Sequence, residues 1–154
     1  MPNLQIIDLT AHADGVQVTL YNAGNAAATN DFWVDVYFDP RETPRLNHEW
    51  ETLADNGIAF GVTVPITPGG TLVLDTAGPF FDPDESSVPP WPVGVPVYSF
   101  VDSVDYATTY GAVHESDETD NLFGPVTSTA AEETGAPVMR SERRWGAGTS
   151  LPQR

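Results

Sequence analysis

The feature that most constrains the fold is an alternation of apolar and polar residues with a period of two. Residues 15–21 read GVQVTLY and residues 32–38 read FWVDVYF, so nearly every second side chain is apolar. This period is typical of β-strands that bury one face. No window of ten residues shows the spacing of an amphipathic helix, and 14 Pro and 13 Gly punctuate the chain with turns. The sequence therefore predicts an all-β protein.

Seven short stretches have strand character, and turn residues separate them. We expect strands at residues 4–13, 15–21, 32–38, 57–66, 70–74, 96–101 and 121–126. This spacing predicts a seven-stranded antiparallel Ig-like β-sandwich over residues 1–126. The expected core residues are Leu4, Ile6, Val16, Val18, Leu20, Phe32, Val34, Val36, Leu72, Leu74, Tyr98 and Phe100. A slip of one residue on any strand would exchange its two faces.

The composition changes after Val126. Residues 127–154 are small, polar and rich in turn residues, so we expect them to form a flexible linker or tail. The charge changes as well, because residues 1–139 carry −19 and residues 140–154 carry +3, within a total of −16. These opposite charges leave a second possibility open, that the tail docks on its own domain or on a neighbouring copy.

The charge and the lack of cysteine exclude several classes of function. A surface with 22 acidic residues repels nucleic-acid phosphates, so no nucleic-acid partner is expected. Without cysteine the chain has no disulfide, zinc-thiolate site or thiol nucleophile. No stretch reaches about 18 apolar residues, so we expect no membrane span. The motifs of zinc proteases, serine hydrolases and phosphate-binding loops are absent, and we expect no enzyme.

Two motifs resemble a known family. Residues 22–27 read Asn-Ala-Gly-Asn-Ala-Ala after a strand, and residues 115–121 read Glu-Ser-Asp-Glu-Thr-Asp-Asn. Both are similar to motifs of the CARDB module, the cell adhesion related domain found in bacteria. The resemblance implies an Ig-like, non-catalytic structural or adhesive module of an exported prokaryotic protein, extracellular or on the cell surface. Such a module would act as a spacer or as a self-assembling unit of a fibre or array, with other proteins or copies of itself as partners.

Oxygen-bearing side chains gather in one loop of the predicted sandwich. Asp102, Glu115, Glu118 and Asp120 supply carboxylates, and hard oxygen ligands suit Ca²⁺ better than zinc or copper. Antiparallel pairing of the strands on either side would bring the two ends of this loop together. The loop is therefore a candidate calcium site. The alternative is that these oxygens only accept hydrogen bonds from the backbone at a corner of the sandwich.

Aromatic residues in loops indicate an alternative function of another class. Trp50 and Trp91 lie in irregular segments, and exposed tryptophan rings stack on sugars. The alternative is therefore a carbohydrate-binding module that uses these two residues, with a glycan as partner. The competing interpretation of Trp50 is that it packs on an edge of the sandwich as a lid.

Overall fold

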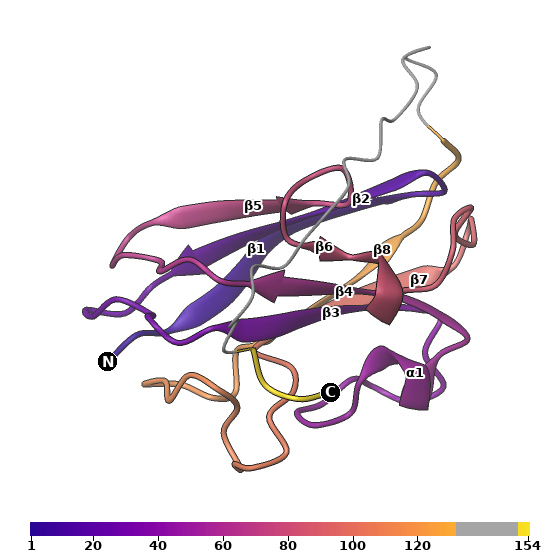
Figure 1. Cartoon of the computed structure of the whole chain (residues 1–154). Coiled ribbons are helices and arrows are strands. Elements are labelled where there is room, and N and C mark those ends of the chain that lie inside the picture. The colour runs from indigo at the N-terminus through magenta and orange to yellow at the C-terminus, as the bar shows by residue number, and fades with distance from the viewer. Residues whose placement is uncertain (132–150) are drawn as a thin grey trace.

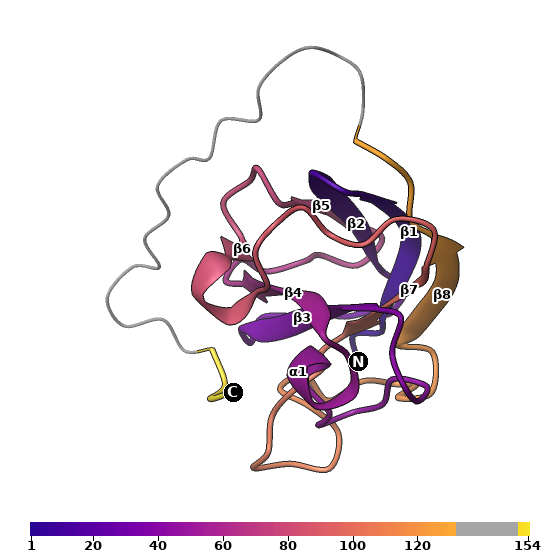
Figure 2. The ribbon, with the colours of Figure 1, turned by 90° about the vertical axis from the view of Figure 1, so that its right-hand side faces the viewer.

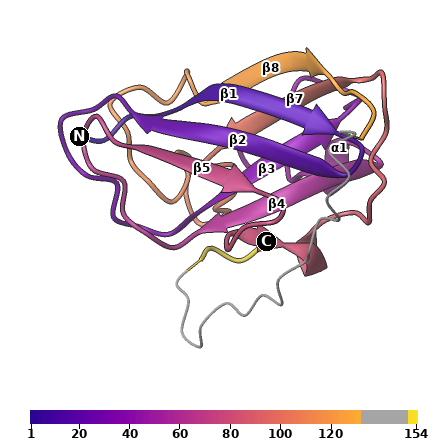
Figure 3. The same cartoon turned by 90° about the horizontal axis from the view of Figure 1, so that it is seen from above.

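The computed structural model describes residues 1–131 and 151–154, and two antiparallel sheets face each other in it (Figures 1 and 2). The three-stranded sheet has the order β1 (Leu4–His12), β2 (Gly15–Asn22) and β5 (Thr71–Asp75). The five-stranded sheet has the order β6 (Phe81–Asp82), β4 (Asn56–Val62), β3 (Phe32–Phe38), β7 (Pro96–Val101) and β8 (Leu122–Thr127). Figure 3 views the first sheet from outside, with β1, β2 and β5 in front. The prediction of an all-β sandwich is confirmed.

The described residues contain eight strands, where the sequence predicts seven. The additional strand is β6, a two-residue strand in the proline-rich segment 75–93, and it pairs with Ala59 and Phe60 of β4. A strand of two residues is too short to show an alternating sequence pattern. It forms because the edge of β4 is free to pair with it. Within residues 1–131 and 151–154, helical structure is limited to α1 (Trp50–Leu53) and the 3₁₀ turn η1 (Pro83–Glu85). Among the described residues no helix is long and apolar enough to cross a membrane.

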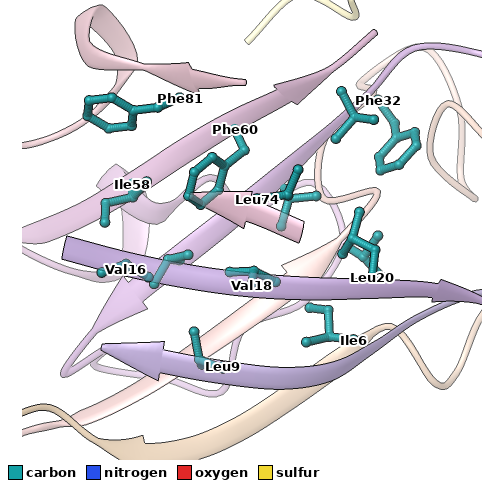
Figure 4. Packing of buried hydrophobic residues seen from close by; sticks show 14 of the residues in the cluster. Ile6, Leu9, Val16, Val18, Leu20, Phe32, Ile58, Phe60, Leu74 and Phe81 are labelled. Atoms are coloured by element: carbon teal, nitrogen blue, oxygen red, sulfur yellow. The ribbon is translucent and has the colours of Figure 1, made fainter. Parts of the chain in front are cut away.

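Apolar side chains of both sheets meet between them and form the main core (Figure 4). The alternation in β2 is confirmed, because Val16, Val18 and Leu20 are all buried while the polar residues between them are not. Ten of the twelve predicted core residues are buried, and Leu72 and Tyr98 are partly buried.

Strand β7 turns its large side chains away from this core. Val97 and Val101 point into the space between the sheets, whereas Tyr98 and Phe100 belong to a second cluster with Tyr37 and Trp50. Phe100 is therefore buried as predicted and Tyr98 partly so, but both pack in this second cluster and not between the two sheets. The cause is that β7 is covered on both faces, so its apolar pattern does not distinguish the inner face from the outer one.

Strand β3 is buried along its entire length, on both faces. The three-stranded sheet covers its inner face. Its outer face is covered by α1, by the loop that follows β7 and by residues 151–154, three segments far apart in the sequence (Figure 2). This second layer makes room for polar residues that are buried without being part of the main core.

The body of the domain continues slightly beyond the predicted boundary. β8 ends at Thr127, and the backbone N–H groups of Ser128 and Thr129 still donate to Val95 and Ala11. Residues 132–150, most of the predicted tail, lie outside the described residues. Residues 151–154 dock on the outer face of β3, which is the second possibility that the charge pattern leaves open.

Candidate functional site

Four acidic side chains surround the side chain of Arg154 on the outer face of the five-stranded sheet, and we call this site the acidic pocket: Asp35, Glu49, Glu51 and Glu85. Its floor is Asp35, in the middle of β3, and this charged side chain is fully buried. The alternation of β3 places Trp33 and Tyr37 on the same face. Burying a carboxylate costs free energy unless it is paired and hydrogen-bonded, so the partners of Asp35 decide whether the sheet tolerates it.

Both carboxylate oxygens of Asp35 have partners. The backbone N–H of Trp50 donates to Oδ2 at 2.8 Å, and the hydroxyl of Ser103 donates to Oδ1 at 2.7 Å. The guanidinium of Arg154 donates from Nη1 to Oδ1 at 2.7 Å and from Nη2 to Oδ2 at 2.9 Å. This is the bidentate, charge-assisted geometry that makes arginine–carboxylate pairs strong. The Arg154 side chain is only 3% exposed, so the pair is almost entirely removed from water.

Three more carboxylates surround the same guanidinium. Glu85 lies 3.4 Å from Nε of Arg154, Glu51 lies 3.3 Å from Nη2, and Glu49 lies 4.0 Å from Nη2. The ring of Trp33 lies below the guanidinium, with its centroid 4.7 Å from Cζ. A planar cation is therefore held at its edge by carboxylates and at its face by an aromatic ring.

The residues before Arg154 are bound as well. The indole N–H of Trp33 donates to the carbonyl oxygen of Pro152 at 2.6 Å. Leu151 packs against a small apolar cluster formed by Trp33, Ala59 and Val104. The segment is thus held by charge, by a backbone hydrogen bond and by apolar contact, all on one face of the sheet.

The electrostatics of the pocket favour a cation in it. Burial raises the pKa of Glu51 and of Glu85, and the charge of Arg154 opposes both shifts. Burial disfavours the charged form of Arg154, but Asp35 outweighs this effect and the pKa of Arg154 lies above its ordinary value. Without the arginine, four carboxylates would share a partly dry site and repel one another.

The sequence alone does not predict this pocket, although it contains two signals for it. Asp35 lies within an otherwise apolar strand, where an alternating pattern assigns it to the solvent side. The positive charge of residues 140–154 indicates docking but does not say where. Only the second layer over β3 shows that Asp35 is buried and paired.

The four predicted calcium ligands, Asp102, Glu115, Glu118 and Asp120, all lie in the segment that joins β7 to β8, which we call the acidic corner. Asp102 and Glu115 are buried, and the other two are partly buried. The charges of Asp102 and Glu118 act on Glu115, so these three are within electrostatic reach of one another. Among the described residues, however, no three His, Asp or Glu side chains are grouped as metal ligands.

Hydrogen bonds within the protein occupy most oxygens of the acidic corner. Asp102 accepts from the backbone N–H groups of Ala112 and Val113, at 2.8 and 2.9 Å. Glu118 accepts from the N–H of Glu115 at 2.9 Å, and Glu115 from the side-chain amide of Asn121 at 2.8 Å. These bonds match the alternative to a calcium site, in which the oxygens accept hydrogen bonds from within the protein. Three buried oxygens nearby nevertheless have no hydrogen-bond partner: Oδ1 of Asn3, of Asp120 and of Asn121.

Burial perturbs the two inner acids of this corner. It raises the pKa of Asp102 to about 7 and that of Glu115 to about 8. In the unfolded chain both carboxyls titrate near pH 4. The folded state therefore holds more protons than the unfolded state above that pH. It follows that the stability linked to these protons is fully present below about pH 4 and is lost as the pH rises through 7 to 8.

The two tryptophans proposed for sugar binding are both buried. Trp50 is 8% exposed, and its indole N–H donates to the carbonyl oxygen of Glu85 at 2.8 Å. Trp91 is 3% exposed and stacks on Phe38 in the main core. Neither ring offers a free face to a sugar in this structure, and Trp50 packs as the lid interpretation expects.

Comparison with known proteins gives one likeness in structure. No protein-family model matches the chain, and neither does any curated protein. The crystal structure of the CARDB domain of a Pyrococcus furiosus protein, in complex with di-metal ions, is similar to this chain. The identity is 19%, the match covers 84% of this chain and 96% of that one, and the TM-score is 0.46. The domain that is found thus carries the name of the family that the sequence motifs resemble.

Proposed function

We propose that this chain is a non-catalytic module that works by holding an arginine-bearing protein segment in the acidic pocket. It would serve as a structural or adhesive unit of an exported prokaryotic protein, at the cell surface or outside the cell, as a spacer or a self-assembling unit. One observation carries the proposal: the bidentate contact between Arg154 and the fully buried Asp35. A buried carboxylate without a counter-charge destabilises its sheet, so a cation at that point stabilises this one.

The contacts of the pocket support selectivity for arginine over lysine. Two parallel N–H groups of a guanidinium match the two oxygens of Asp35, whereas an ammonium is a point charge without this geometry. Trp33 adds a flat surface for the guanidinium and a donor for the carbonyl two residues earlier. The ligand class is therefore a peptide with a free carbonyl two positions before an arginine.

The arrangement of the other buried acids supports a non-catalytic role. Asp102 and Glu115 both accept hydrogen bonds from groups of the domain itself, which engages them in holding the loop between β7 and β8. Carboxyl groups that accept hydrogen bonds from their own backbone fix the conformation of the loop and are not available to contact a substrate.

We also propose Ca²⁺ as a ligand of the acidic corner. The unpaired oxygens of Asn3, Asp120 and Asn121 support this, because a buried acceptor without a partner costs free energy that a cation would recover. The side-chain amide of Asn3 donates to the second carboxylate oxygen of Asp120 at 3.0 Å, which keeps these two residues together.

A peptide titration tests the main function. In the full-length R154A variant the pocket lacks its own occupant, and a fluorescent peptide of residues 147–154 is titrated into it while anisotropy is recorded. We expect saturable binding to the variant and weaker binding to the wild type, whose pocket is filled. The same peptide with Lys at position 154 is the matched control, and it should bind about tenfold more weakly, or about 1.4 kcal/mol. Equal binding of the two peptides, or none of either, contradicts the proposal.

A further inference from the structure

We propose that residues 151–154 of one copy occupy the acidic pocket of a second copy, so that the chain links into assemblies through exchanged segments. This inference rests on the proposed function, since it names a partner for the same pocket. The partner is the chain itself, and the recognised feature is the Leu-Pro-Gln-Arg sequence whose arginine pairs with Asp35.

The first step of the argument is that exchange preserves every contact. The segment touches the body through the Asp35 carboxylate, the Trp33 indole and the apolar cluster with Ala59 and Val104. All these groups belong to the folded body, and an identical body presents them identically. The two modes of docking therefore differ only in the cost of the connecting chain and in the concentration of partners.

The second step concerns the connecting chain. Residues 132–150 join the end of the body to the docked segment, and Figures 1 and 2 show these two points on opposite sides of the sandwich. Random-coil statistics for a chain of this length give a root-mean-square span of about 25 Å. A globular body of about 130 residues has a radius of gyration of about 14 Å, so a path around it measures about 40–55 Å. The path is longer than this average span, so docking within one copy carries a free-energy cost that exchange between copies avoids.

The third step concerns charge. Each copy is strongly acidic, with a net charge of −19 over residues 1–139, so two copies repel each other. This repulsion acts over long distances, and salt therefore screens it. The pair between Arg154 and Asp35 is close and desolvated, so salt weakens it much less. Exchange is therefore expected to increase with ionic strength, which is the opposite of the response of an exposed ion pair.

The geometry also predicts the type of assembly. Donor segment and acceptor pocket are different parts of the same surface, so each copy can give one segment and receive another. Such a head-to-tail contact forms open chains or closed rings, and reciprocal exchange forms a dimer.

Crosslinking between two single-cysteine variants tests this directly, because the natural chain has no cysteine. One variant is Q153C, at an exposed position in the segment, and the other is D84C, at an exposed position beside Glu85 of the pocket. Each full-length variant is first shown to melt like the wild type. The two are then mixed, equilibrated in high salt and treated with a short bismaleimide.

In the mixture we expect several-fold more crosslinked dimer than in either variant alone, and loss of that excess when Q153C also carries R154A. The double variant with both cysteines in one chain reports on docking within a copy. If it crosslinks only to itself while the mixture forms no extra dimer, exchange is refuted and the pocket still binds its own segment. If neither sample crosslinks, the segment does not occupy the pocket, and the proposed function fails as well.

Discussion

Replacing Arg154 by alanine isolates the contact on which the pocket depends. The substitution leaves the carboxylate of Asp35 with the Trp50 N–H and the Ser103 hydroxyl but without a counter-charge. It also removes the cation that opposes the raised pKa values of Glu51 and Glu85. We expect the free energy of unfolding to fall.

The size of the loss follows from burial. Removing one partner of a buried ion pair costs about 3–5 kcal/mol, whereas an exposed pair contributes about 0–1 kcal/mol. Both side chains of this pair are at most 3% exposed, so the first range applies. Undocking of the segment lets water reach Asp35 and recovers part of the cost, so we expect about 2–3 kcal/mol. For a chain of this length that lowers the melting temperature by about 6–9 °C.

Urea unfolding followed by tryptophan fluorescence measures the difference. The matched control is R41A, because Arg41 pairs with Asp55 at 3.2 Å while the two side chains are 58% and 92% exposed. We expect that control to change stability by no more than about 0.5 kcal/mol. R154K keeps the charge without the bidentate geometry and should lose about half as much as R154A. If R154A unfolds at the same urea concentration as R41A, the reasoning about the pocket is wrong.

Three further predictions concern other parts of the domain. Stability should fall as the pH rises from 5 to 7, by up to about 1.4 kcal/mol per pH unit for each raised carboxyl of the acidic corner, and D102N should flatten this slope in urea titrations at several pH values. G57A should cost about 2–3 kcal/mol, because a Cβ there would lie 2.3 Å from the ring of Trp50, whereas a Cβ at Gly15 meets only ordinary contacts and G15A should melt almost like the wild type. Millimolar Ca²⁺ should raise the melting temperature relative to EDTA, more than Mg²⁺ at matched ionic strength, and D120A should abolish the difference; coincident curves would assign the corner to hydrogen bonds alone.

The inner faces of the strands could be predicted from sequence because one side of the sandwich obeys a simple rule. Over residues 16–20 of β2 the inner residues are apolar and the outer ones polar, so the register follows from the pattern. β7 does not obey the rule, since Val97 and Phe100 are both buried, on opposite faces. When both faces of a strand are covered, an apolar residue in the sequence predicts burial but does not indicate on which face the side chain lies.

The pocket could not be predicted because it depends on contacts between distant segments. Asp35 comes from a strand, Glu49 from the residue before α1, Glu85 from η1 and Arg154 from beyond residue 150. Each of these charges is ordinary in its own neighbourhood, and only the fold brings them together. The same holds for Trp91, which looks like a loop residue in the sequence and proves to be a core residue because the proline-rich segment folds back over Phe38.

The separation of Asp35 and Arg154 along the chain has a consequence for kinetics. They lie 119 residues apart, and their contact needs the sheet and the second layer to be in place first. Contacts of this kind form after the rate-limiting step of folding, because closing so long a loop is unfavourable until other contacts repay it. Replacing Arg154 by alanine should therefore leave the refolding rate unchanged. The whole loss of about 2–3 kcal/mol in the free energy of unfolding should appear as an unfolding rate that is about 30- to 150-fold faster. Docking of the segment would thus set the lifetime of the folded domain rather than the speed at which it forms.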